Sequence, residues 1–142
     1  MLTYRLLHPE ILLALGEAGH GARVLIADGN YPVSTHSNPA ARRVFLNLAP
    51  DRPRVTEVLE VLAEAIPVEA AHVMSPGLGG EPSIFREFQV LLPGIELERL
   101  ERFAFYDAAR EPEVALAIAT GERRIYANIL LTIGVVSPVE RA

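Results

Sequence analysis

Apolar side chains recur every three or four residues along several segments of the chain, which is the spacing of an amphipathic helix. The clearest such segment covers residues 55–66. Pro9 suits the first turn of another helix, and Gly19 and Gly21 suit the exit from it. The pattern predicts four helices, over residues 9–17, 55–66, 83–92 and 102–110.

Short, continuous apolar runs alternate with these helices. Residues 24–27 are typical of a strand that is buried on both faces. Further strands are predicted over residues 44–46, 71–74, 95–100, 114–119 and 129–136. Because helices and buried strands alternate, the sequence predicts a layered α/β fold. We see no linker that would divide the chain, so we expect residues 1–142 to form a single domain.

The composition excludes several kinds of chemistry. The chain has no cysteine and no lysine, so all 13 basic residues are arginine. Cysteine nucleophiles, thiolate metal sites, Schiff-base lysines and the lysine of a phosphate-binding loop are therefore absent. The net charge of −5 argues against a nucleic-acid partner. No segment has the length of a membrane span and no secretion signal opens the chain, so we expect a cytoplasmic protein without a membrane partner.

His20 is the histidine that stands out, because it lies between Gly19 and Gly21 at the entrance to the first buried strand. The glycines allow a ligand to approach the ring, and a neutral imidazole can exchange protons near pH 7. The alternative, which local sequence alone favours, is a histidine that caps the end of the preceding helix. The four histidines show no metal-pair spacing, so we expect no metal.

Four other residues are candidates for binding a polyol. Asp28 directly follows the first buried strand, and ligands of open α/β sheets bind beyond the carboxyl ends of strands. Arg102, Tyr126 and Asn128 supply donors and acceptors of the kind that hydroxyl groups need. Three of them have a structural alternative: an Asx-turn for Asp28, a solvated helix start for Arg102 and a half-buried core aromatic for Tyr126.

Other polar or glycine-rich segments are predicted to have no catalytic role. The loop 75–80 lacks the lysine and the glycine spacing of phosphate binders, so we interpret it as a plain loop. We interpret the arginine pairs at 42–43 and 123–124 as solvated surface, and Glu96, Glu98 and Glu101 as a solvated face.

Two blocks of the chain, residues 8–32 and 95–136, resemble one known family. The first holds Gly19-His20-Gly21, an apolar strand ending in Asp28, and Pro32. The second holds Arg-Phe-Ala-Phe-Tyr at 102–106, Thr-Gly-Glu at 120–122, Tyr-Ala-Asn-Ile-Leu-Leu at 126–131 and Gly-Val at 134–135. The combination resembles the D-ribose pyranase / L-fucose mutarotase family, whose members interconvert cyclic forms of free sugars.

The resemblance implies a role for each candidate residue. His20 corresponds to the proton donor of the family and Asp28 to a sugar-binding carboxylate. Tyr126 and Asn128 correspond to a pair that contacts the sugar. Arg102 lies where fucose-type members have arginine, whereas Tyr-Ala-Asn at 126–128 is the ribose-type form. Asn30 lies where fucose-type members often have histidine. The resemblance thus favours an L-fucose-like sugar, with D-ribose as the alternative and no cofactor.

The resemblance also implies a three-layer α/β/α subunit with a mostly parallel or mixed central sheet. It implies a homodecamer, a ring of two stacked pentamers whose sites lie between neighbouring subunits. His20 and Asp28 flank one strand that spans up to roughly 26 Å if fully extended. Either the strand ends fold back, or a neighbouring chain completes the site. Two other functions stay open: a non-catalytic sugar-binding accessory protein of a transport system, and a purely structural subunit.

Overall fold

The computed structural model describes residues 1–138 of the chain. The helices are α1 (Pro9–Glu17), α2 (Val55–Ala65), α3 (Ile84–Leu91) and α4 (Arg102–Ala109). The strands are β1 (Arg23–Ala27), β2 (Arg42–Phe45), β3 (Val68–Ser75), β4 (Leu97–Glu101), β5 (Val114–Ala119) and β6 (Ile129–Ile133). All the predicted elements are present, and their ends lie within three residues of the prediction. Among the described helices, none is long and apolar enough to cross a membrane.

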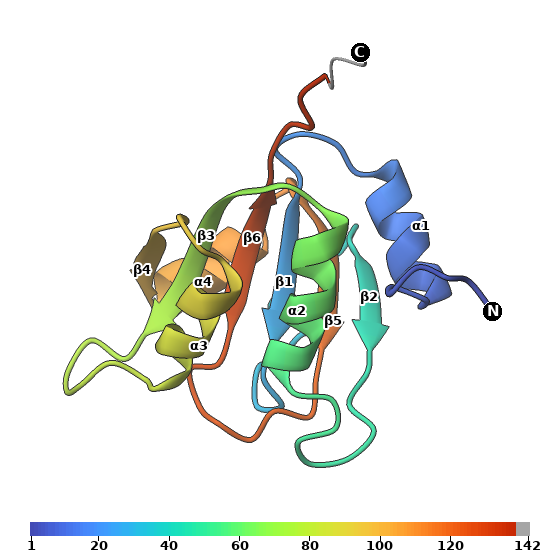
Figure 1. The fold of residues 1–142 in the computed structure, drawn as a ribbon. Helices are drawn as coiled ribbons and strands as arrows, with labels where there is room; N and C mark the ends of the chain where they lie inside the picture. Colours follow the sequence, from blue (N-terminus) through green and yellow to red (C-terminus); the bar gives the residue numbers. More distant parts are fainter. Residues whose placement is uncertain (139–142) are drawn as a thin grey trace.

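All six strands join one mixed sheet, in the order β2-β5-β1-β6-β3-β4. Strand β6 runs antiparallel to both of its neighbours, β1 and β3. The remaining pairs are parallel. The segment that leads into β6 therefore lies at the same edge of the sheet as the residues that follow β1, β3 and β4 (Figure 1). This edge brings together residues that are about a hundred positions apart in the sequence.

Helices cover both faces of the sheet and give the predicted three-layer α/β/α arrangement (Figure 1). On one face, apolar side chains of α1, α2 and α3 pack with the sheet in a single hydrophobic core. Phe88 of α3 and Leu59 of α2 are fully buried in this core. On the other face, Phe105 and Ala109 of α4 pack in a second, smaller core. Burying both faces explains why β1 reads as a continuous apolar run.

The loop between β5 and β6 is held in place by unusually close packing. An added Cβ at Gly121 would lie 2.1 Å from the carbonyl oxygen of Ala49, so only glycine fits there. The next residue, Glu122, is 1% exposed and accepts a hydrogen bond from the backbone N–H of Val55 at the start of α2. Arg124 then forms ion pairs with Glu122 and with Glu87 of α3. The interpretation of Arg124 as solvated surface is therefore wrong, because a buried carboxylate needs a charged partner.

Candidate active site

A pocket of about 250 Å³ lies at the edge of the sheet where β1, β3 and β4 end and β6 begins. Four of the five predicted site residues line it, namely Asp28, Arg102, Tyr126 and Asn128. They come from the loop after β1, the first residue of α4 and the segment before β6. The mixed topology of the sheet is what brings these segments together.

Asp28 is 3% exposed, and backbone donors surround its carboxylate. One oxygen accepts hydrogen bonds from the N–H groups of Asn30 (3.0 Å) and Tyr31 (2.9 Å), and the other from that of Ala127 (3.2 Å). The Asx-turn considered as the alternative is therefore present, in a residue that also lines the pocket. Burial raises the pKa of the Asp28 carboxyl above its ordinary range, although the hydrogen bonds oppose this shift.

Asn128 is buried beside Asp28, and its amide has a defined orientation. The side-chain oxygen accepts a hydrogen bond from the backbone N–H of Asp28 at 2.7 Å. The amide nitrogen then lies 4.0 Å from the sulfur of Met74, which is a weak acceptor. The Asn128 amide therefore has donor capacity left for a ligand oxygen in the pocket.

Tyr126 has a left-handed backbone conformation, with φ of 57°. This conformation is uncommon for a residue other than glycine, and it costs of order 1–3 kcal/mol. Its half-buried ring contributes both to the second hydrophobic core and to the wall of the pocket. The alternative of a half-buried aromatic is thus correct as a description of burial, while the backbone strain is a feature that often accompanies functional sites.

Arg102 is exposed at the start of α4, where Glu101 caps the helix by accepting a hydrogen bond from the N–H of Ala104. The Arg102 guanidinium lies over the ring of Phe103, 4.6 Å from its centroid. Such stacking orients the planar guanidinium and leaves the N–H donors at its edge available for hydroxyl oxygens.

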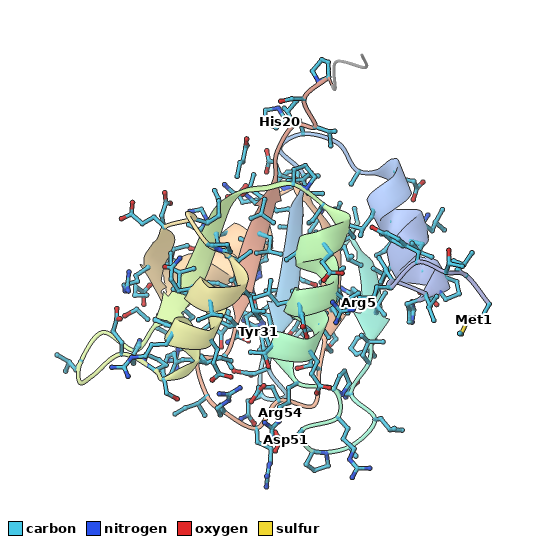
Figure 2. The ribbon with its side chains drawn as sticks, in the orientation of Figure 1. Met1, Arg5, His20, Tyr31, Asp51 and Arg54 are labelled. Carbon is cyan, nitrogen blue, oxygen red and sulfur yellow. The ribbon has the colours of Figure 1, made fainter. Side chains whose placement is uncertain are left out.

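His20 does not lie in this pocket. It precedes β1, whereas Asp28 follows it, and the five residues of that strand span about 16 Å. Figure 2 shows His20 near the top of the molecule and Tyr31, which lines the pocket, in the lower half. The ring is exposed, and its Nε2 lies 3.0 Å from a carboxylate oxygen of Glu69. Within a single chain, His20 therefore lies far from the other four predicted site residues. The ends of β1 do not fold back to bring them together.

Neither does His20 cap the preceding helix. Helix α1 is closed by Ala18, whose backbone N–H donates to the carbonyl oxygens of Ala14 and Leu15. The His20 ring faces Glu69 of β3 instead. The capping alternative is therefore wrong. The imidazole lies at the surface beside the Glu69 carboxylate and is not buried in the apolar core.

Several pocket residues were not singled out from the sequence. Tyr106 and Met74 line the pocket, and Ile125 lies at its boundary with a second cleft of about 460 Å³. The loop 75–80, interpreted as a plain loop, contributes Pro76, Leu78 and Gly80 to that cleft. These residues look like ordinary core or loop positions in the sequence, and only the shared sheet edge marks them. Within residues 1–138, no cluster of three His, Asp or Glu side chains could hold a metal ion.

Comparison with known proteins identifies the family. A model of the RbsD / FucU transport protein family matches residues 1–136. The chain belongs to the RbsD / FucU family. This confirms the resemblance seen in the two sequence blocks, and it extends the match across the middle segment, 33–94, which sequence reading alone left unassigned.

Relatives in the RbsD / FucU family cover nearly the whole chain. The fucose mutarotase of Bos taurus is 31% identical over 147 residues, covering 94% of this chain and 92% of that protein. The structure of Bacillus subtilis RbsD complexed with D-ribose aligns with a TM-score of 0.84 at 25% identity, over 96% of this chain and all of that one. The fucose mutarotase of Streptococcus pneumoniae in complex with L-fucose aligns with a TM-score of 0.79 at 26% identity, over 92% and 94% of the two chains.

Proposed function

We propose that this protein is a monosaccharide mutarotase, an isomerase that opens and recloses the ring of a free sugar. The observation that carries the proposal is the convergence of Asp28, Arg102, Tyr126 and Asn128 on one pocket, in a member of the RbsD / FucU family. A pocket with few, well-placed polar groups at a sheet edge is where α/β proteins bind small ligands.

The proposed substrate is an L-fucose-like sugar, with D-ribose as the alternative. Arg102 and the Asn128 amide offer donors, and Asp28 offers carboxylate acceptors, so the pocket suits a ligand with hydroxyl groups on several ring carbons. Curated relatives are named fucose mutarotases, and the B. subtilis relative was crystallised with D-ribose, so both sugars are reasonable candidates.

Ring opening requires two proton transfers. One proton goes to the ring oxygen as the bond from that oxygen to the anomeric carbon breaks. Another leaves the anomeric hydroxyl as its C–O bond becomes a carbonyl, and closure reverses both transfers. We assign His20 as the donor, and water, Asp28 or Tyr126 as the acceptor. Positioned acid–base groups contribute typically 10²–10⁴-fold in rate. No oxidation state changes, so the reaction needs no redox cofactor.

Because His20 lies away from the pocket of its own chain, the proposal requires His20 of a neighbouring copy. In support of this, the exposed imidazole and the pocket lie at opposite ends of one strand, so a neighbouring copy could bring its own imidazole to the pocket. A homo-oligomer is therefore part of the proposal, and the decameric ring is its specific form. The cytoplasmic location expected from the sequence stays a prediction.

Exchange NMR on L-fucose and D-ribose tests the proposal directly. The protein should accelerate exchange between the anomers or ring forms of at least one sugar. A His20→Ala variant should lose most of the acceleration, whereas Arg5→Ala, a change in an exposed ion-pairing residue outside the pocket, should not. Binding of the sugars without acceleration would instead favour the non-catalytic accessory role.

A further inference from the structure

We infer that Met74 and Ile125 determine specificity by contacting an apolar end of the sugar, the methyl group of a 6-deoxyhexose. The inference rests on the proposed mutarotase function and adds to it the side chains that distinguish a methyl from a hydroxymethyl group. Both residues line the sugar pocket, and both are apolar in a lining that is otherwise mostly polar or aromatic.

Met74 lies near the end of β3 and is 4% exposed. Its sulfur is adjacent to the Asn128 amide, which fixes its place among the polar residues of the pocket. A thioether side chain is soft and adaptable, and it packs well against small apolar groups. It offers no strong hydrogen-bond partner to a ligand hydroxyl.

Ile125 is 65% exposed, although it is a large apolar residue. It precedes Tyr126, whose left-handed backbone fixes the direction in which the chain enters β6. An isolated exposed isoleucine needs no explanation, but this one lines two adjoining cavities. A ligand methyl group placed against it would bury apolar surface on both partners.

A second cavity adjoins the pocket at Ile125. The apolar cleft, as we call it, shares Ile125 and Tyr126 with the sugar pocket. Its other lining includes Pro76, Leu78, Pro82 and Ile84. The charged residue in its lining is Arg124, whose guanidinium is engaged by Glu122 and Glu87. A ligand hydroxyl directed toward the apolar cleft would therefore lose its hydrogen bonds to water and contact apolar side chains instead.

That exchange sets the expected selectivity. A buried hydroxyl without a partner loses its hydrogen bonds to water, whereas a methyl group in the same place gains from burial. Apolar pockets discriminate against an added hydroxyl by at most roughly 10²-fold, because they reject it only passively. L-Fucose and L-galactose provide a matched pair, since they differ only in the methyl or hydroxymethyl group at carbon 6.

The experiment measures kcat/KM for both sugars by exchange NMR in the wild-type protein and four variants. Ile125→Gln places a hydrogen-bonding group at an exposed position, so folding should be unaffected, and Ile125→Leu retains the apolar contact. Met74→Leu is the corresponding conservative change at the buried position. Val90→Gln makes the same apolar-to-polar change on an exposed residue of α3 outside both cavities.

The wild-type protein should prefer L-fucose over L-galactose by about tenfold or more. Ile125→Gln should reduce that ratio by about tenfold, chiefly through KM, while Ile125→Leu, Met74→Leu and Val90→Gln should preserve it. A wild-type ratio near one, or an unchanged ratio in Ile125→Gln, would overturn the inference while leaving the mutarotase function intact. Failure of the wild-type protein to accelerate exchange of any sugar would instead overturn the proposed function.

Discussion

The side-chain oxygen of Asn128 accepts a hydrogen bond from the backbone N–H of Asp28 at 2.7 Å, although the two residues are 100 positions apart. The carboxylate of Asp28 in turn accepts from the N–H of Ala127. These reciprocal bonds tie the exit of β1 to the entrance of β6, two neighbouring antiparallel strands at the centre of the sheet. Asp28 and Asn128 are therefore held by the ends of the two central strands of the sheet.

Asn128→Ala should lower both stability and activity. The variant leaves the buried N–H of Asp28 without its acceptor, which costs about 1–3 kcal/mol of unfolding free energy. It also removes the amide donor that faces the pocket, so sugar exchange should fall at least tenfold. Urea denaturation measures the first effect and exchange NMR the second. Thr132→Val, in the strand β6 that follows Asn128, is the control.

The Thr132 hydroxyl oxygen is buried and has no hydrogen-bond partner among the described residues. Replacing it with an isosteric methyl should leave stability unchanged or slightly raised. Equal losses of stability in Asn128→Ala and Thr132→Val would show that the hydrogen bond between Asn128 and Asp28 does not contribute measurably to the free energy of unfolding.

Gly121→Ala should destabilise the protein, because the added methyl would overlap the carbonyl oxygen of Ala49. Forcing extra volume into a packed site costs typically about 1–3 kcal/mol, and the displaced loop leads directly to Tyr126 and Asn128. We therefore expect a lower midpoint of thermal unfolding together with a raised KM.

Gly16→Ala is the matched contrast. Gly16 lies within α1, and an added Cβ there would meet nothing within 4 Å. Alanine is the better helix former by up to about 1 kcal/mol, so this variant should be as stable as the wild type or more so. A similar loss of stability in both glycine variants would contradict the steric explanation for Gly121.

The sequence was sufficient to predict the helices and strands and four of the nine residues that line the pocket, for identifiable reasons. Strand β1 is a continuous apolar run because both of its faces are covered, and the helices carry clear periodicity. Asp28 was found because it follows such a strand. Tyr126 and Asn128 were assigned their roles through a family motif, since nothing in local sequence pairs them with Asp28. Their convergence depends on the antiparallel placement of β6, which hydrophobic patterning does not encode.

Other features depend on three-dimensional packing alone. Arg124 reads as half of a surface arginine pair, yet the burial of Glu122 draws it into an ion-pair network. Nothing in the sequence marks Met74 or Ile125 as a pocket residue, because an apolar wall of a pocket and an apolar core have the same composition. The contact between His20 and Glu69 joins residues 49 positions apart and has no local signal.

The pKa of Asp28 should lie above the ordinary aspartate value of about 3.9. Between the unfolded and the folded pKa, the native state binds more protons than the unfolded state. The free energy of unfolding contributed by this group therefore falls as pH rises through that window, and the contribution is most favourable below it. A ¹³C NMR titration of the Asp28 carboxyl measures the midpoint directly.

Asp51 provides an internal contrast in the same titration. Hydrogen bonds from the backbone and the guanidinium of Arg123 lower the pKa of the Asp51 carboxyl. Its favourable contribution is therefore lost as pH falls through the lowered pKa, the opposite sign to Asp28. If Asp28 titrated below Asp51, burial would not be the dominant influence on Asp28.

A site shared between copies predicts that two inactive variants restore each other. His20→Ala retains the pocket but lacks the imidazole, whereas Arg102→Ala retains the imidazole but lacks a pocket side chain. Both residues are exposed, so both variants should fold. In randomly mixed oligomers, about a quarter of the sites combine an intact His20 with an intact Arg102 from the neighbouring chain. Exchange NMR on the mixture, after unfolding and refolding together, should therefore recover up to about a quarter of wild-type activity.

Two controls decide what recovery means. Each variant refolded alone should stay inactive, which excludes an effect of refolding itself. A chain carrying both substitutions, mixed with His20→Ala, should also stay inactive, because no neighbour then supplies an imidazole. If the mixture of single variants shows only the summed activity of its parents, the imidazole does not come from a neighbouring copy. The separation of His20 from Asp28 along β1 would then remove His20 from the reaction, because no conformation of one folded chain brings the two together while β1 stays paired on both sides.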